Sequence, residues 1–276
     1  MESTIEIYSP EWFINRQGNF TGSEIWKLMT EARSKKDVLS KTAETYILEK
    51  VWEKLSGEVK QGINNFATEW GNDNEPTAKK FYSSVTGNEV KDSLMLYSNE
   101  IQGLTGSPDG LVGEDGLIEI KCPYNGANHL KHCFITNDET FLSEQPEYYY
   151  QMQCYMLLSG RKWCDFVSFD PRIISDLGLF IYRVNANEEV IEKMTEKVKL
   201  ARELFNQYFE SIDVDTSSDS SEEIKNAKFK IPNFEAINLP TNTRTRSRLQ
   251  KIFEQEDEEV FNEIQRIWDL MYVIKK

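Results

Sequence analysis

The spacing of apolar and polar residues predicts that the chain begins with helices. Ser9 followed by Pro10 is typical of a helix start, with serine as the cap and proline at the first helical position. Thr21 and Glu24 have the spacing of a capping box, and an apolar stripe follows them. This pattern places Ser23 in the first turn of a second helix.

Two further helices are predicted in the first hundred residues. Apolar residues recur at helical spacing from Ala43 to Leu55, just before Gly57. The stretch NEPTAKKFYSSVTG predicts a helix that begins at Pro76 and ends at Gly87. The first part of the chain is therefore expected to be mostly helical.

The pattern changes at Ser93, where apolar and polar residues begin to alternate around Gly and Pro turns, as they do in strands. SEQPEYYYQMQCYMLLSG then predicts a helix, and WCDFVSF and LFIYRV predict further strands. Apolar residues on one helical face predict a last helix from Glu188 to Phe209. The order of elements favours an α/β fold with a central mixed sheet flanked by helices.

The composition after this helix predicts a domain boundary. DVDTSSDSSEE is too poor in apolar residues to fold and indicates a linker. We therefore expect one domain at 1–210, an acidic Ser-rich linker at 211–224 and a helical extension at 225–276. The extension is expected to contain a helix from about Arg246 to Tyr272, packed through its apolar side.

Composition limits the classes of protein. No apolar stretch approaches the roughly 20 residues that span a bilayer, and the first residues lack the order of a signal peptide, so a cytoplasmic protein without a membrane partner is expected. The four cysteines form no CxxC pair, and there are only two histidines. Both counts favour a carboxylate-bound Mg²⁺ over a zinc or histidine-rich centre.

Net charge excludes a general polyanion binder. The chain carries −14 at pH 7, whereas non-specific affinity for nucleic acid comes from lysine and arginine neutralising phosphates. An enzyme acting on DNA with this charge would need locally basic surfaces, or would have to hold DNA by enclosing it.

Candidate chemistry lies in the stretch GSPDGLVGEDGLIEIKCPY, residues 106–124. Because side chains alternate along a strand, Leu117, Glu119 and Lys121 share one face of GLIEIK, and Ile118 and Ile120 point to the other. The apolar pattern fixes this register. The acid and the lysine are thus predicted on the same, solvent-facing surface.

Asp109, in the preceding SPDG turn, reaches that surface if the two segments pair as a hairpin. Two carboxylates and a backbone carbonyl there suit Mg²⁺, a hard cation that keeps several waters. Lys121 would then lie beside metal-bound water, where an ammonium can orient or help deprotonate it and offset charge developing on a phosphate.

These residues resemble the signature of PD-(D/E)xK nucleases: Asp109, a gap of nine residues, and Glu119-Ile120-Lys121. SPDG and EIKCP, with WGNDNEPTAKKFY upstream and YYYQMQCYM downstream, are also similar to the lambda-exonuclease and YqaJ-type viral recombinase family. The resemblance covers roughly Trp12 to Asp170. It implies a restriction-endonuclease-like α/β core.

The resemblance also implies roles in catalysis. Asp109, Glu119 and the carbonyl of Ile120 would bind the metal, and Lys121 would act on the water. Mg²⁺ is the expected ion, with Mn²⁺ as the alternative. Glu75 would support the metal, often through water in that family.

Further positions match a glutamine and a phosphate site of the family. Gln153 matches the second glutamine of a helix that approaches the active site. Arg16, Ser23 and Ser107 match residues that hold the 5′ phosphate of the end being digested. A serine at a helix start beside an arginine also suits a phosphate on physical grounds alone.

The implied activity is 5′-to-3′ exonuclease digestion of linear double-stranded DNA to mononucleotides, leaving a 3′ overhang for phage-type recombination. Family precedent implies a ring-shaped homotrimer, a single-strand annealing protein as partner, and a phage or prophage origin in a bacterial cell. A structure-specific or restriction-like endonuclease and a non-catalytic DNA-binding protein stay open as alternatives.

Each residue also has a purely structural interpretation. Asp109 would serve the turn, and Glu119 with Lys121 would form an ion pair on one face. Arg16 would be a surface charge and Gln153 a partly buried residue bonded to backbone. His129, His132 and Cys133 have no evident fourth ligand and receive no role.

Overall fold

The computed structural model describes residues 9–34, 37–58, 66–98 and 101–217. Its larger sheet is mixed, with the strand order β2-β5-β6-β7-β8. These strands are β2 (Val90–Lys91), β5 (Gly110–Val112), β6 (Gly116–Lys121), β7 (Trp163–Phe169) and β8 (Leu179–Asn185). Only β6 and β7 pair in parallel, and the other neighbours are antiparallel.

A smaller sheet of three strands has the order β1-β4-β3. Strand β1 (Phe20–Thr21) is parallel to β4 (Leu104–Gly106), and β3 (Leu96–Tyr97) is antiparallel to it. This sheet brings the segment before Ser23 beside the segment that leads to Ser107.

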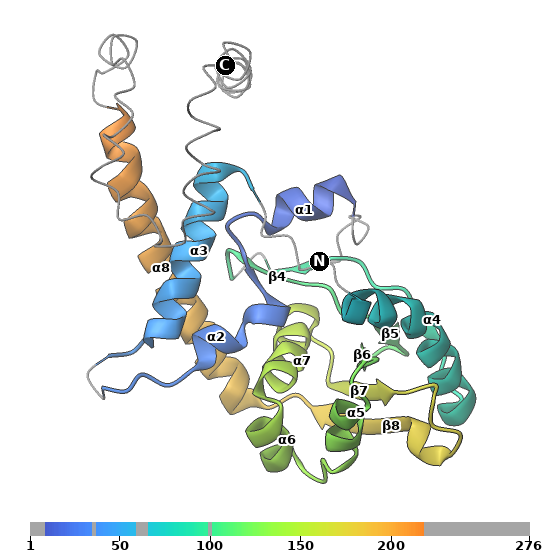
Figure 1. Cartoon of the computed structure of the whole chain (residues 1–276). Coiled ribbons are helices and arrows are strands. Elements are labelled where there is room, and N and C mark those ends of the chain that lie inside the picture. The colour runs from blue at the N-terminus through green and yellow to red at the C-terminus, as the bar shows by residue number, and fades with distance from the viewer. Residues whose placement is uncertain (1–8, 35–36, 59–65, 99–100, 218–276) are drawn as a thin grey trace, which may run out of the picture. The chain divides into compact units, whose positions relative to one another are not determined.

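The helices surround these sheets (Figure 1). The long ones are α3 (Lys41–Ser56), α4 (Phe66–Thr86), α7 (Pro146–Ser159) and α8 (Glu188–Ser217). The shorter ones are α1 (Pro10–Arg16), η1 (Gly22–Glu24), α2 (Trp26–Met29), α5 (Gly126–Cys133), α6 (Asp138–Glu144) and η2 (Asp176–Gly178). An α/β fold with mixed sheets flanked by helices is thereby confirmed.

The apolar alternation in β6 is confirmed, because its two sides belong to different hydrophobic clusters. Leu117 packs with residues of α6 and α7, such as Phe141 and Met152. Ile118 and Ile120 pack with residues of α4. Helices cover both faces, so β6 is buried on both sides, as strands with parallel neighbours usually are.

The predicted helix start at Pro76 is wrong. Helix α4 covers Phe66–Thr86 and runs through Pro76, so the packing of α4 on the sheet has to offset the hydrogen bond lost and the steric cost of an internal proline. Glu75 thus lies inside a helix and not in its first turn. Thr21 is the N-cap residue of η1 and Ser23 lies in that turn, as predicted, but the turn is a three-residue 3₁₀ helix and Thr21 makes no side-chain cap. The predicted start at Ser9 and Pro10 is confirmed, with the Ser9 side chain accepting a hydrogen bond from the Trp12 N–H.

Helix α8 continues to Ser217, so it includes the first residues of the segment predicted as a linker at 211–224. Most of that segment, and the predicted extension at 225–276 with its helix, lie outside the described residues. Their organisation stays a prediction. Among the described residues, no helix is long and apolar enough to cross a membrane.

Candidate active site

Asp109 is tied to strand β6 by a backbone hydrogen bond. Strand β5 starts at Gly110, which pairs with Ile118, so the β5–β6 ladder ends before Ile120. The Ile120 N–H instead donates to Oδ2 of Asp109 at 2.6 Å. The hairpin expected from the sequence is confirmed, and it places Asp109 beside the Glu119-Ile120-Lys121 segment.

Glu119 is buried, with 1% of its surface exposed, so the expectation of a solvent-facing carboxylate is wrong. The reason is helix α7, which covers this part of β6. Oε1 of Glu119 accepts hydrogen bonds from Nζ of Lys121 and, at 2.8 Å, from Nε2 of Gln151. Oε2 is buried and has no hydrogen-bond partner among the described residues.

Burial and mutual repulsion shift the ionisation of these groups. Burial raises the pKa of Asp109 well above its usual value, and the neighbouring Glu119 charge adds to the rise. Burial also raises the pKa of Glu119, although Lys121 opposes that rise. Burial alone would lower the pKa of Lys121, but the carboxylates of Glu119 and Asp109 outweigh it and raise that pKa. The carboxylates therefore favour the ammonium form of Lys121, which donates a hydrogen bond to Glu119.

These groups fit a hard divalent cation. The unpartnered Oε2 of Glu119 is an anionic oxygen with nothing to offset its desolvation, and Asp109 lies next to it. Ile120 lies next to Glu119 on β6 and lines a hollow together with Asp109, and its carbonyl points to the same edge of β6 as its N–H. No group of three or more His, Cys, Asp or Glu side chains gathers in the described part of the chain. A cation would thus be held by two carboxylates, one carbonyl and water.

The structure places Gln151, and not Gln153, at these carboxylates. Gln151 donates to Glu119 and to the hydroxyl of Tyr155 at 2.7 Å. Gln153 lies on another side of α7, where it donates to the Asn185 carbonyl and accepts from the Asn187 N–H. The assignment of Gln153 is therefore corrected. The four-residue spacing of Gln151 and Tyr155 was the available signal, because it puts both on one helical face.

Two hollows meet at the carboxylates. The first, of about 640 Å³, is lined by both acids, Lys121 and Gln151, and also by Arg16, Ser23 and Ser107. The second, of about 690 Å³, lies between α4 and the segment after β6 and includes Gly71, Pro123 and Tyr148. Glu75, Asp109 and Lys121 line both. Glu75 also pairs with Lys79 at 3.0 Å on the same helix.

The three residues predicted to bind the 5′ phosphate come together in the first hollow: Arg16, Ser23 and Ser107. A tryptophan contacts two of them. Nε1 of Trp12 donates to Oγ of Ser107 at 2.9 Å. The Arg16 guanidinium lies 4.3 Å from the centroid of the Trp12 ring. The sequence interpretation gave Trp12 no role, although its i,i+4 spacing from Arg16 puts the two on one side of α1.

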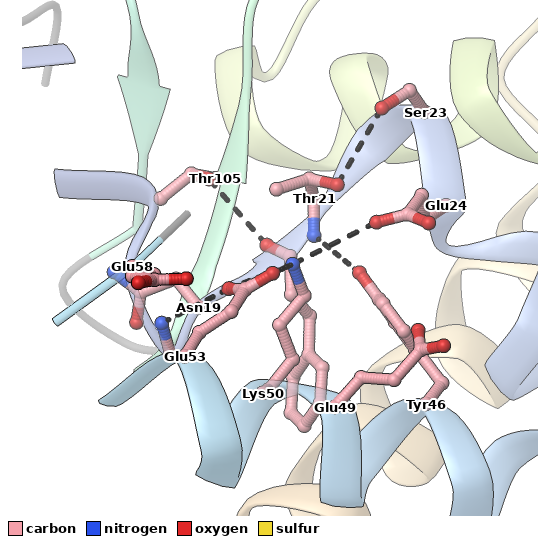
Figure 2. Close-up of polar contacts among 12 residues, drawn as sticks. Asn19, Thr21, Ser23, Glu24, Tyr46, Glu49, Lys50, Glu53, Glu58 and Thr105 are labelled. Carbon is pink, nitrogen blue, oxygen red and sulfur yellow. Dashed lines mark hydrogen bonds and ion pairs between the residues drawn. The ribbon is translucent and has the colours of Figure 1, made fainter. Parts of the chain in front are cut away.

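A buried ion cluster supports the turn that carries Ser23 (Figure 2). The Thr21 N–H donates to the Tyr46 hydroxyl at 3.0 Å, and the hydroxyls of Thr21 and Ser23 lie 3.4 Å apart. Beneath the turn, Nζ of Lys50 lies 2.9 Å from Oε1 of Glu53 and 3.6 Å from Oε2 of Glu24. Helix α3 thus positions the turn through a neutral hydrogen bond and an ion pair.

The two histidines connect helix α5 to the sheet. Nδ1 of His129 and Nδ1 of His132 both lie 2.8 Å from Oγ of Ser168, and Nε2 of His129 lies 2.7 Å from the Leu177 carbonyl. Burial lowers the pKa of His132 to about 4, so it is neutral near pH 7. Together they tie α5 to β7 and to the loop after it.

Three features together define a nuclease of the PD-(D/E)xK fold class. They are the acids on a β-hairpin, the adjacent lysine, and the helices on both faces of the mixed sheet. The match to known families is more specific. Residues 11–162, more than half of the chain, match the YqaJ-like viral recombinase domain. The chain belongs to this family.

Solved structures agree with that assignment. An alkaline exonuclease from Laribacter hongkongensis is 33% identical, with a TM-score of 0.64 over 75% of this chain and 98% of that chain. The same exonuclease in complex with dAMP gives 32% identity and a TM-score of 0.63 over 79% and 100% of the two chains. A phage-related exonuclease from Haemophilus somnus 129PT, 24% identical with a TM-score of 0.59 over 70% and 96%, shares the fold. A comparison with curated proteins gave no match.

Replacing Lys50 by methionine is expected to lower the free energy of unfolding by about 3–5 kcal/mol, because Glu53 would remain buried without its partner. Lys162→Met is the matched control: its pair with Asp115 is exposed, so the expected loss is about 0–1 kcal/mol. Chemical denaturation of the two variants measures both values. Equal losses would mean that the buried pair does not support the turn.

Proposed function

We propose that this protein is a Mg²⁺-dependent exonuclease that digests linear double-stranded DNA from its 5′ ends. One observation carries the proposal: the hollow that contains Asp109, Glu119 and Lys121 also contains Arg16 and Ser107. A carboxylate–lysine site serves hydrolysis of a phosphodiester, and an arginine with hydroxyls serves a terminal phosphate. Because these two groups of residues lie in one hollow, we infer that the phosphodiester is cut next to a DNA end.

The relatives support the same activity. The Laribacter protein is an alkaline exonuclease, its structure has been solved with the mononucleotide dAMP, and this chain covers nearly all of it. The family is one of viral recombinases. We infer that the products here are mononucleotides and a 3′ overhang, used in phage-type recombination with a single-strand annealing protein as partner.

The chain's own residues prepare the reaction. Asp109, Glu119 and the Ile120 carbonyl would hold Mg²⁺, or Mn²⁺ in its place, and Glu75 would bind its water. When bound, the ion supplies Lewis-acid stabilisation and a more acidic water. Gln151 fixes one oxygen of Glu119 and leaves the other available. Lys121, as an ammonium, orients the water by hydrogen bonding and offsets negative charge on the phosphate.

Replacing Asp109 by asparagine is expected to abolish nucleotide release, and EDTA should do the same to the unmodified protein. Lys121→Ala should lower turnover roughly 10²- to 10³-fold while cation binding persists, because Lys121 orients the water and stabilises charge on the phosphate. Initial rates on linear duplex DNA measure both effects. Lys162→Ala, whose partner is Asp115 on the surface, serves as control and should keep full activity. Full activity of Asp109→Asn would refute the site.

Arg16→Ala is expected to remove the preference for phosphorylated 5′ ends. A charge-assisted hydrogen bond of about 1.5–3 kcal/mol predicts a loss of roughly ten- to a hundredfold on phosphorylated duplexes. Rates on matched duplexes that differ only in the 5′ phosphate measure the effect. Hydroxyl ends should respond much less, because Asp109, Glu119 and Lys121 are unchanged. Arg33→Ala, an exposed arginine outside the hollow, should behave as the unmodified protein.

Equal losses for Arg16→Ala on phosphorylated and hydroxyl ends would assign Arg16 to the fold or to general DNA binding. The phosphate pocket would then have to be placed elsewhere.

We propose further that the protein works as a closed homotrimer around DNA, because a chain of net charge −14 has no general attraction for a polyanion. A closed ring would hold the DNA without electrostatic attraction. Sedimentation should show a trimer, and single encounters should release many nucleotides. A monomer that digests long DNA processively would contradict the ring and leave the metal site unaffected.

A further inference from the structure

An exposed aromatic cluster borders the second hollow and has no part in the mechanism above. It consists of Phe66 and Trp70 of α4, Tyr124 after β6, and Arg172. The Phe66 and Tyr124 rings meet edge to face at 4.8 Å, and the Trp70 and Tyr124 rings lie 5.8 Å apart. The Arg172 guanidinium lies 4.7 Å from the centroid of the Trp70 ring.

Hydrogen bonds donated by Arg172 fix the cluster in place. Arg172 donates to both oxygens of Asp170, from Nε at 2.8 Å and from Nη2 at 2.7 Å. Its Nη2 also donates to the Tyr124 carbonyl at 2.9 Å. The Asp170 side chain is only 3% exposed. Arg172 thus holds the Tyr124 segment against Trp70, and the rings are arranged before any ligand arrives.

Two rings of the cluster face solvent. Phe66 is 63% exposed and Tyr124 is 46% exposed, although both are large aromatic side chains. Thr68, two residues after Phe66, and Pro123, next to Tyr124, line the second hollow together with Asp109 and Lys121. The exposed rings therefore lie next to segments that line the candidate active site.

The two hollows give the substrate strand a direction, on the basis of the proposed function. A terminal 5′ phosphate at Arg16 and Ser107 occupies the first hollow. The scissile phosphate lies at Asp109 and Lys121, which line both hollows. The nucleotides on the 3′ side of the cut then enter the second hollow, which the aromatic cluster borders.

We propose that the aromatic cluster is a stacking site for an unpaired base of the strand being cut, on the 3′ side of the scissile phosphate. Phosphate is not the ligand that its chemistry suits, because the guanidinium of Arg172 is already neutralised by Asp170. The exposed groups are the rings of Phe66 and Tyr124. Stacking on such rings accepts every base, as an enzyme that digests DNA of any sequence requires.

The test compares 5′-phosphorylated duplexes with and without abasic residues near the 5′ end of the cut strand. Removing the bases should slow the unmodified protein roughly five- to a hundredfold, the range expected for one stacked base. Phe66→Ala and Tyr124→Ala should be slowed to a similar degree on normal DNA. They should lose nothing more on abasic DNA, since the ring and the base act as a pair.

Phe134→Ala is the control, because Phe134 is an aromatic residue that is 76% exposed and does not belong to the aromatic cluster. It should keep the full response to base removal, and thermal melting should show all three variants folded. If removing the ring and removing the base slowed digestion additively, the stacking site would be refuted. It would also be refuted if only abasic residues in the opposite strand slowed digestion. A protein that digests normal DNA but ignores base removal refutes this inference only, whereas one that digests no DNA refutes the proposed function.

Discussion

The structure depends on one unfavourable arrangement: the buried carboxylate of Glu119 lies beside a second carboxylate, Asp109, and the two share a single lysine. When both acids are ionised, they carry with Lys121 a net charge of −1 around a carboxylate that is 1% exposed. One oxygen of Glu119 has no partner at all among the described residues. Burying an unpaired anionic oxygen costs several kcal/mol. The fold retains it, and a divalent cation is the ligand that would relieve it.

Helix α7 connects this arrangement to the proposed phosphate pocket. Gln151 of α7 bonds to Glu119 and Tyr155, and the Tyr155 ring packs directly on two glycines. A Cβ at Gly22 or Gly106 would come within 2.5 and 2.7 Å of that ring. These glycines precede Ser23 and Ser107, so the same ring that positions Gln151 also sets the two serine-bearing segments. The proposed metal site and the proposed phosphate pocket therefore share the packing of Tyr155 on these two glycines.

Much of this could be predicted from the sequence. The alternation in GLIEIK gave the faces of β6, and the SPDG turn gave the hairpin that brings Asp109 to Glu119, because both follow from local geometry. Burial of Glu119 could not be predicted, since it depends on which helix covers the strand. The match of Gln153 to the second glutamine of the family's helix has the same limit, because it does not show which side of α7 faces the sheet. The predicted start of α4 at Pro76 is wrong, because proline favours helix starts. It is nevertheless tolerated inside a helix when packing supports the rest of that helix.

The most direct test of an end-directed nuclease uses Mg²⁺ with linear duplex DNA labelled at either its 5′ or its 3′ ends, and a closed circular duplex of the same sequence. The account predicts that the 5′ label is released first as a mononucleotide, that the 3′ label stays on a long strand, and that the circle remains intact. Digestion of the circle as fast as the linear DNA would contradict it, because a phosphate pocket beside the metal site would then have no part in choosing where the enzyme cuts.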